Sequence, residues 1–458
     1  MSVWRQLTTE RRVGVVGLFA AGKTVLLTST VNHLSDHDPD RFRLGSGRHP
    51  VTLRKFRVVP PTPGWEPFPY AASRDALVNK GKWPAKTRDR SEYACRFERS
   101  DWVFSDAVLR LYDFPGERLA DAAMLGRTYD EWSDHWHALT TADTVQRDCS
   151  RGFLDTLSVP TTPEAELLAA YRLALATAIS APYYKPFVTP STFLLDADGR
   201  LARGDTPEAV AAGRVAGLTE YTQFCPLPAT FRGKRPELVG TFTAAYEQYQ
   251  TTIVGPYVEA LRSCHALIVV VDVLHLLAAG VGACNDNRQI LRDLFDVLGP
   301  GETLVNRIAR NAAELVMPGA LAAIRKVAFV VPKIDLVHPR DRDKLPHLLK
   351  RFVGKLADDR DGLTAGYFPV SAIRSTKALA ADDPERTLVG VPYRDAAGAK
   401  IPPGVEQRYP ATALPDEWPH AWRAGEYTFP EVYPAVPALH SYPPDQIGLD
   451  RVVEFVLG

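Results

Sequence analysis

Residues 17–24 read GLFAAGKT, in which four residues separate the first glycine from a Gly-Lys-Thr run. This spacing is typical of a loop that cradles phosphate groups, because Gly17 and Gly22 let the backbone wrap closely and direct its N–H groups inward. Lys23 would place a positive charge on the β- and γ-phosphates, and Thr24 would offer its hydroxyl to Mg²⁺. The residues expected to contact the nucleotide here are Gly17, Ala20, Ala21, Gly22, Lys23, Thr24 and Val25.

A second candidate element, DFPGE at 113–117, follows the apolar run AVLRLY. Asp113 could hold Mg²⁺ directly or through water, and Gly116 could give its backbone N–H to a γ-phosphate, as in the D-x-x-G element of GTPases. The alternative is a surface turn, since Pro-Gly is a common turn pair. Glu117 stands where Ras-like proteins keep a water-orienting glutamine. It could act catalytically on the attacking water, or the γ-phosphate could repel it.

A base-recognition element is predicted at 332–335, where PKID follows the apolar run VAFVV. It resembles the N-K-x-D element that reads guanine. Asp335 would accept hydrogen bonds from guanine N1–H and the exocyclic amine, which adenine cannot supply, and the Lys333 stem would lie over the base. Pro332 departs from the usual Asn or Thr, so a supporting contact is missing. The alternative is an ordinary K-x-D at the end of a strand.

Residues 371–373, SAI, follow the strand-like YFPV and resemble the S-A-K element, whose backbone N–H contacts the guanine oxygen. The members of this element are Ser371, Ala372 and Ile373. Four elements now occur in the expected order, each at the carboxyl end of a predicted strand. That is where ligands bind in open α/β sheets.

A GTPase also needs a mobile threonine between the phosphate loop and D-x-x-G to sense Mg²⁺ and the γ-phosphate. Thr52 and Thr87 are the candidates, and we favour Thr87, in KWPAKTRDRSEY, because it lies just before the strands that lead to Asp113. Arg88 beside it could act as an arginine finger in cis, although such an arginine more often anchors a loop.

Apolar runs at 12–17, 107–112, 266–272, 327–332 and 366–370 predict strands that alternate with helices or loops. This pattern indicates an α/β fold with a mostly parallel sheet, that of a P-loop NTPase with a Ras-like G domain. Residues 162–179 and 241–262 are strongly helical and indicate a helical insert, and Pro256 should kink the second helix. Residues 40–92 and 380–445 have no clean periodicity. Asp450 is expected to cap a last helix over Arg451–Leu457.

The predicted organisation is a discontinuous G domain with insertions. Its first part is 1–117 and its second part, with the base-recognition elements, is 263–378. A mainly helical insert occupies 118–262, a Pro- and Tyr-rich excursion occupies 379–446, and 447–458 is a C-terminal helix that returns to the G domain.

Lysine and arginine equal aspartate and glutamate, 54 each, so bulk attraction to nucleic acid or to an anionic membrane is not predicted. Five widely spaced cysteines fit free thiols in a reducing cytoplasm. The apolar run Ala266–Ala283 is short for a membrane span and contains Asp272 and His275, so it is interpreted as a buried strand. We expect a cytoplasmic protein and leave peripheral association with the inner membrane open.

With these residues assembled, the chain resembles the YcjX-like family of bacterial P-loop GTPases over nearly its whole length. The segments that carry the resemblance are GLFAAGKTVLLTSTVNHL (17–34), KWPAKTRD (82–89), LYDFPGERLAD (111–121), YKPFVTPSTFLLD (184–196), VVVDVLHLLAAGVGACND (269–286) and the ending IGLDRVVEFVLG. The resemblance implies a Ras-like G domain with a helical insert, bound GTP or GDP, and an association with envelope stress. The family's base element usually reads T-K-x-D, so Pro332 is a departure.

Together these features predict an Mg²⁺-dependent protein that binds and slowly hydrolyses GTP as a nucleotide-gated switch. Thr24, Thr87 and Asp113 would hold or sense Mg²⁺, and Lys23 would stabilise the transferring phosphoryl group. A P-loop ATPase or kinase is one alternative. Another is a nucleotide-stabilised scaffold with negligible turnover. A protein effector or regulator is expected, and its identity is left open.

Overall fold

The computed structural model describes residues 9–18, 21–45, 50–85, 90–102, 106–142, 144–180, 188–194, 206–212, 223–298, 324–357, 363–381, 383–394, 399–435 and 442–458. The chain forms two compact units. The sheet unit comprises Met1–Gly116, Ser263–Val281 and Leu321–Gly458, and the helical unit comprises Glu117–Arg262 and Gly282–Ala320.

The sheet unit is built on an eight-stranded sheet in the order β2-β4-β5-β1-β6-β7-β8, with β3 paired to β4 at one edge. The strands are β1 (Thr9–Gly17), β2 (Leu53–Val59), β3 (Glu66–Pro67), β4 (Ser91–Arg99), β5 (Asp106–Asp113), β6 (Ala266–Val270), β7 (Lys326–Val331) and β8 (Thr364–Pro369). Neighbours from β5 through β1, β6 and β7 to β8 are parallel, whereas β2, β4 and β5 pair antiparallel. The predicted α/β P-loop fold with a mostly parallel sheet is therefore confirmed.

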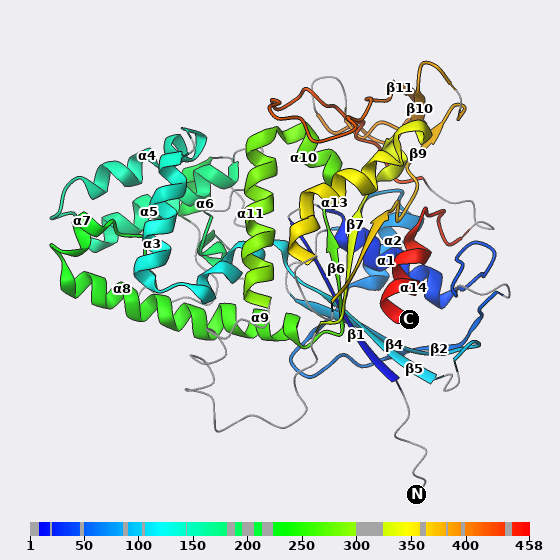
Figure 1. Cartoon of the computed structure of the whole chain (residues 1–458), viewed down its shortest axis with the longest axis horizontal. Helices are drawn as coiled ribbons and strands as arrows, with labels where there is room; N and C mark the ends of the chain where they lie inside the picture. Colours follow the sequence, from blue (N-terminus) through cyan, green and yellow to red (C-terminus); the bar gives the residue numbers. More distant parts are fainter. Residues whose placement is uncertain are drawn as a thin grey trace, which may run out of the picture. The chain divides into compact units, whose positions relative to one another are not determined.

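Helices cover both faces of this sheet (Figure 1). The helices of the unit are α1 (Lys23–Ser35), α2 (Tyr70–Val78), α10 (Val273–Ala279), α13 (Lys344–Ala357) and α14 (Leu449–Leu457), with short turns η6 (Ile334–Leu336) and η7 (Pro339–Asp341). On one face Phe368 of β8 packs on Phe455 of α14, and α1 joins the same apolar cluster. On the other face Tyr367 of β8 stacks on Phe329 and lies beneath Lys350 of α13. Adjacent residues of β8 thus face different helices, as alternation along a strand requires.

Two regions without clean periodicity contain regular elements. Residues 40–92 hold β2 and α2, and residues 376–410 form a small antiparallel sheet in the order β11-β10-β9. Its strands are β9 (Thr376–Ala378), β10 (Thr387–Gly390) and β11 (Gln407–Pro410). The expectation that Asp450 caps the last helix is wrong: Gly448, in a left-handed conformation, is the cap residue, and Asp450 lies in the first turn. There its charge complements the helix dipole.

The helical unit is an assembly of helices around an aromatic core. Its elements are η2 (Gly116–Gly126, which begins on the last residue of the sheet unit), α3 (Tyr129–Ala142), α4 (Thr144–Leu157), α5 (Glu164–Ser180), η3 (Ser191–Leu194), α6 (Pro207–Ala211), α7 (Ala229–Arg232), α8 (Pro236–Tyr249), η5 (Gln250–Val254), α9 (Gly255–Arg262) and α11 (Val281–Leu298). Trp132, Phe224 and Tyr246 stack edge to face or tilted at its centre, with centroids 5.4–5.5 Å apart. Pro256, which is expected to kink a single helix, lies in α9 immediately after the π-turn η5.

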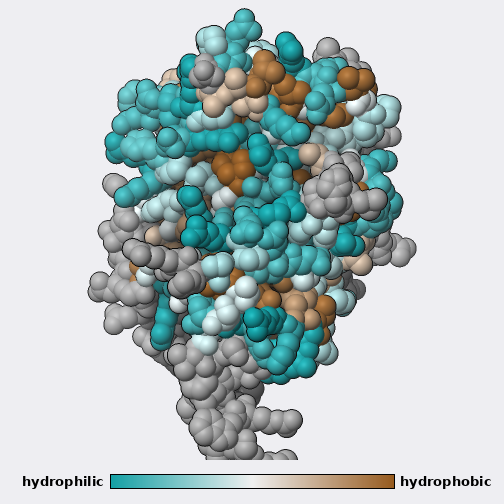
Figure 2. Space-filling model, turned by 90° about the vertical axis from the view of Figure 1, so that its right-hand side faces the viewer, coloured by the Kyte–Doolittle hydropathy of each residue, from teal (hydrophilic) through white to brown (hydrophobic). Residues whose placement is uncertain are grey.

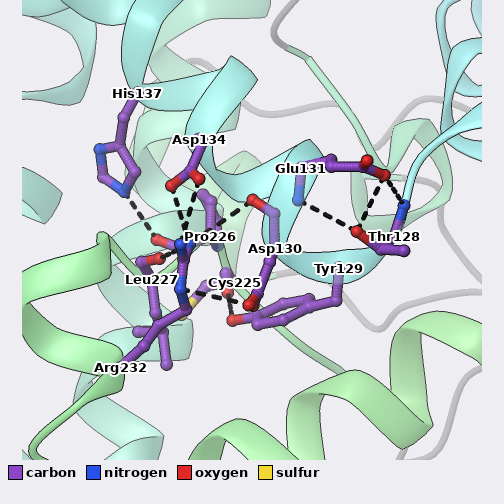
Figure 3. Close-up of polar contacts among 10 residues, drawn as sticks. All are labelled: Thr128, Tyr129, Asp130, Glu131, Asp134, His137, Cys225, Pro226, Leu227 and Arg232. Atoms are coloured by element: carbon purple, nitrogen blue, oxygen red, sulfur yellow. Dashed lines mark hydrogen bonds and ion pairs between the residues drawn. The ribbon is translucent and has the colours of Figure 1, made fainter.

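The start of α3 is fixed by polar contacts drawn in Figure 3. Thr128 and Glu131 form a reciprocal capping box, in which Glu131 Oε2 accepts from the Thr128 N–H at 2.8 Å. Arg232 of α7 forms a two-pronged ion pair with Asp134 and also lies near Asp130. These contacts join α7 to α3.

Helix α11 differs from the predicted organisation, which placed 263–378 in the G domain. From Gly282 onward this helix groups with the helical unit. Its buried residues, including Ile290, Leu294 and Phe295, form an apolar stripe. Such a stripe specifies that a helix is packed on one side without specifying what it packs against.

Asp121 is a buried carboxylate at the centre of the helical unit, 2% exposed. It accepts hydrogen bonds from the Ser191 hydroxyl at 2.6 Å, the Ser191 N–H at 2.9 Å and the Tyr249 hydroxyl at 2.8 Å. Burial, the main cause of the shift, raises the pKa of Asp121 to about 6. Asp121 thus ties the segment that follows D-x-x-G to η3 and α8.

We expect this carboxylate to make the stability of the helical unit depend on pH. Because the folded pKa lies above the unfolded value of 3.8, the stabilising contribution is fully present below about pH 4. As pH rises through about 6 this contribution is lost, which lowers the free energy of unfolding by about 3 kcal/mol. Urea unfolding between pH 4 and 7 should show this decline in the parent chain. It should be missing in Asp121→Asn, and an equal decline in both would contradict the assignment.

The surface displayed in Figure 2 is mainly hydrophilic, with hydrophobic residues in separate spots. Within the described ranges, no helix has the length and apolar character needed to cross a bilayer. The apolar run Ala266–Ala283 is divided between β6, which is buried throughout, α10 and the start of α11. All five cysteines are free thiols.

Candidate nucleotide-binding site

The phosphate loop connects β1, in the middle of the sheet, to the start of α1. Gly22 has φ +91°, a left-handed conformation that favours glycine, and α1 begins at Lys23. The Lys23 Nζ donates to the Gly17 carbonyl at 2.7 Å and approaches the Leu18 carbonyl at 3.4 Å. The lysine therefore lies over the loop that the sequence predicts to surround phosphate. Ala21 is buried, whereas Thr24 and Val25 are half-buried. Ala20 lies outside the described residues.

The D-x-x-G element lies against this loop. Asp113 ends β5 directly opposite Val15 of β1 and is 2% exposed. A Cβ atom on Gly116 would overlap the Gly17 carbonyl oxygen and would lie 2.8 Å from the Lys23 Nζ. Only glycine fits this close approach. Gly116 therefore lies against Gly17 and Lys23, and Asp113 lies beside them at the end of β5.

The site contains oxygen ligands of the kind that Mg²⁺ prefers. Asp113 is a buried carboxylate at a strand end beside the loop, and Thr24 contributes a hydroxyl in the first turn of α1. In the part of the chain that the structure describes, no three His, Cys, Asp or Glu side chains form a potential metal cluster. This donor set fits Mg²⁺, which protein sites usually hold through one or two carboxylates and substrate phosphates.

Strand register bears on the choice between the two candidates for the switch threonine, Thr52 and Thr87. Thr52 pairs with Ser100, beyond the Arg99 end of β4 and therefore near the start of β5, far from Asp113. Thr87 and Arg88 lie outside the described residues. Ser91, four residues after Thr87, is directly opposite Asp113 in the β4–β5 ladder. Glu117 follows Gly116 in η2, and its side chain also lies outside the described part.

Lys333 follows Pro332 at the carboxyl end of β7 and has φ +63°. Its Nζ forms an ion pair with Asp272 Oδ2 at 2.6 Å. Asp272 follows β6, the neighbouring strand, and its other oxygen caps α10 by accepting from the His275 N–H at 3.0 Å. Asp272 therefore caps a helix and also pairs with Lys333.

Asp335, the predicted base reader, is 1% exposed. Its Oδ1 accepts from the Ser371 hydroxyl at 2.7 Å. Its Oδ2 accepts from the Ser375 N–H at 2.7 Å, the Ser375 hydroxyl at 2.6 Å and the Thr376 N–H at 3.1 Å. Since a carboxylate has about four acceptor positions, these donors fill them.

The SAI element follows β8 and is fixed from two sides. Ser371 exchanges backbone hydrogen bonds with Ile447, and the Ser29 hydroxyl of α1 donates to the Ala372 carbonyl at 2.6 Å. Ile373 is buried. The helix that starts at the phosphate loop is therefore connected directly to the predicted base element.

Sequence reasoning missed Ser29, Ser375 and the pairing role of Asp272. Asp272 carried a usable signal, since an acidic residue ended an apolar strand at the same sheet edge. Ser29 and Ser375 carried none, because isolated serines in a helix and a loop have no distinctive pattern.

The fold and this arrangement define an α/β protein of the P-loop class. The chain belongs to the YcjX-like family (DUF463), whose model matches residues 11–458. It is 25% identical to the Ras-like GTPase YcjX of Escherichia coli (strain K12) over 99% of this chain and 96% of that protein. It is also 31% identical to the Ras-like GTPase YcjX of Shewanella oneidensis over 26% of this chain and 29% of that protein.

Proposed function

We propose that this chain binds guanine nucleotides with Mg²⁺ and hydrolyses GTP as a nucleotide-gated switch, in envelope stress as the family resemblance implies. The observation that carries the proposal is the convergence of Lys23, Asp113 and Gly116 where β1 and β5 end. A relative matched over nearly the whole chain is named a Ras-like GTPase, which supports the same activity here.

Each residue is assigned a role from its chemistry and, for Lys23, Asp113 and Gly116, also from its position. Lys23 would leave the Gly17 carbonyl for the β- and γ-phosphates and offset the charge that develops on the transferring group. Gly116 would donate its N–H to the γ-phosphate. Thr24, Asp113 and Thr87 would hold Mg²⁺, which when bound neutralises phosphate charge. Residues Gly17 to Val25 would surround the phosphates with backbone N–H groups.

Guanine would be read at the neighbouring strand ends, by Lys333 and Asp335 after β7 and by Ser371, Ala372 and Ile373 after β8. Support comes from the hydrogen bond of Ser371 to Asp335, which joins the two elements at 2.7 Å. Because the acceptor positions of Asp335 are already occupied, the base would have to replace some of the present donors, of which Ser375 supplies two.

The two alternative functions are that of a P-loop ATPase and that of a nucleotide-stabilised scaffold with negligible turnover. The role of Glu117 bears on the second. Loss of turnover in Glu117→Ala would place this carboxylate on the attacking water, whereas unchanged turnover would remove it from the mechanism. Lack of turnover in the parent chain would favour the scaffold.

Nucleotide binding by the purified chain is the first test. We expect GDP and GTPγS with Mg²⁺ to bind at micromolar or lower concentration, and ADP and ATPγS to bind more weakly. Lys23→Ala should weaken guanine nucleotide binding about 100-fold, because it removes a charge that pairs with phosphate. Titration calorimetry measures both effects.

The control is Lys55→Ala, which removes an exposed lysine paired with Glu98 on the edge of the sheet unit. It should bind like the parent chain. Adenine preference, or equal binding by the parent and Lys23→Ala, would refute the proposed function.

A further inference from the structure

We propose that Asp272 is a positioning residue for Lys333, and that their ion pair supplies the support that Pro332 does not give to the base-recognition element. The inference rests on the proposed function, because Lys333 matters only if its stem lies over a purine base. It assigns a role to an acidic residue in the segment VVVDVLHLLAAGVGACND.

The geometry of the Lys333–Asp272 pair is that of an anchor. The Lys333 Nζ lies 2.6 Å from Asp272 Oδ2, and the Asp272 side chain is only 9% exposed, against 43% for Lys333. The carboxylate is itself immobilised, because its other oxygen accepts from the His275 N–H at the start of α10. A fixed carboxylate orients a flexible lysine better than an exposed one, since less side-chain freedom is lost when the pair forms.

The backbone at Lys333 is strained. Lys333 has φ +63°, a left-handed conformation that residues with a Cβ adopt reluctantly. Such conformations persist where the surroundings hold them, and they concentrate at functional sites. Asp272 provides a contact that holds the end of the Lys333 side chain while the strand end holds its backbone.

Pro332 cannot brace the turn before Lys333. An Asn or Thr there could use a polar side chain and an N–H to brace the turn, and Pro332 has neither. The brace comes instead from the adjacent strand. The Val271 N–H donates to the Val330 carbonyl at 2.8 Å, so the chain segments that carry Asp272 and Lys333 are joined just before the two residues.

The consequence is a lysine whose ammonium is anchored at the sheet edge while its aliphatic stem is free to cover a base. Without the anchor, Lys333 would relax toward an ordinary conformation and its stem would leave that position. Nucleotide affinity would fall although the phosphate loop is intact.

Asp272→Asn is the decisive variant, because asparagine still caps a helix but cannot form the ion pair. We expect the Kd for GDP to rise about fivefold, with thermal stability close to that of the parent. Asp272→Asn combined with Pro332→Thr should recover most of the loss. The matched control is Asp75→Asn, which breaks a Lys–Asp pair of the same 2.6 Å length with Lys80 on the surface and should leave GDP binding unchanged.

A second measurement does not depend on nucleotide. Acetylation of Lys333, followed by mass spectrometry, should be slower in the parent than in Asp272→Asn. Equal rates would overturn the proposal, because the pair would not exist in solution. Faster acetylation with an unchanged Kd for GDP would overturn the positioning role and leave the proposed function intact. No GDP binding by the parent chain would overturn both.

Discussion

Replacement of Gly116 by alanine is expected to slow GTP hydrolysis by about 100-fold or more, while GDP binding stays within a few-fold of the parent. The new methyl group would overlap the carbonyl oxygen of Gly17 and approach the Lys23 Nζ to 2.8 Å. The lysine end can move, but Gly17 ends a strand paired on both sides. The D-x-x-G turn must therefore retreat, and its N–H would no longer reach the γ-phosphate. Single-turnover hydrolysis measures the effect.

Gly240→Ala is the matched control. Gly240 lies inside α8, and a Cβ there meets nothing within 4 Å. Alanine should raise the free energy of unfolding by about 0.5–1 kcal/mol and leave hydrolysis unchanged. Hydrolysis by Gly116→Ala at the parent rate would show that this turn does not contact the γ-phosphate, and the role of Gly116 would have to be abandoned.

The strands that could be predicted each contain an apolar run, whether buried throughout, like β6, or half-buried, like β8. Strands β1, β6 and β7 contain runs rich in β-branched residues (VGVV, ALIVV and VAFVV), which composition alone identifies. Strand β2 could not be found in this way, because it lies at the edge of the sheet and reads LRKFRVV with most residues exposed. Its few apolar contacts, from Leu53 and Phe56, give no periodic signal.

The candidate site was predictable to the extent that it lies in local motifs. The phosphate loop and D-x-x-G are contiguous runs, and the strand before each one fixes its place at the sheet edge. The bonds that orient them are not local. Lys333 and Asp272 are 61 residues apart, Ser375 and Asp335 are 40 apart, and Ser29 and Ala372 are 343 apart. Only the folded chain reveals such pairs.

The environment of Asp335 indicates how guanine would reach its carboxylate. Four donors fill the carboxylate, so guanine N1–H and the exocyclic amine can bind only if some of them leave. Three of the four belong to Ser375 and Thr376, in a turn that borders a cavity of about 580 Å³. Ser375 borders this space, whereas Thr376 is held in β9 by its pairing with Gly390 and Ser371 is held by its bridge to Ile447. Exchange at Ser375, which supplies two of the four donors, is therefore the route that costs least.

Asp335→Asn should accordingly have two effects. Without nucleotide, its NH₂ group cannot accept from the N–H and hydroxyl donors of the turn, and the loss of hydrogen bonds to a charged group should lower the free energy of unfolding by about 2 kcal/mol. With nucleotide, preference should shift from guanine toward xanthine, whose additional oxygen accepts from the amide. Urea unfolding and competitive binding of GDP and xanthosine diphosphate measure the two effects.

Ser375→Ala separates the two roles of the carboxylate, because it removes one competing donor and keeps the charge. If the base replaces that donor, GDP should bind about fivefold more tightly in this variant, since one hydrogen bond fewer must be broken. If Asp335→Asn is destabilised but still prefers guanine, and Ser375→Ala binds GDP like the parent, the carboxylate only holds the turn. Guanine selectivity would then have to come from the backbone N–H groups of the SAI element, and Asp335 would be a structural residue that resembles a base reader in sequence alone.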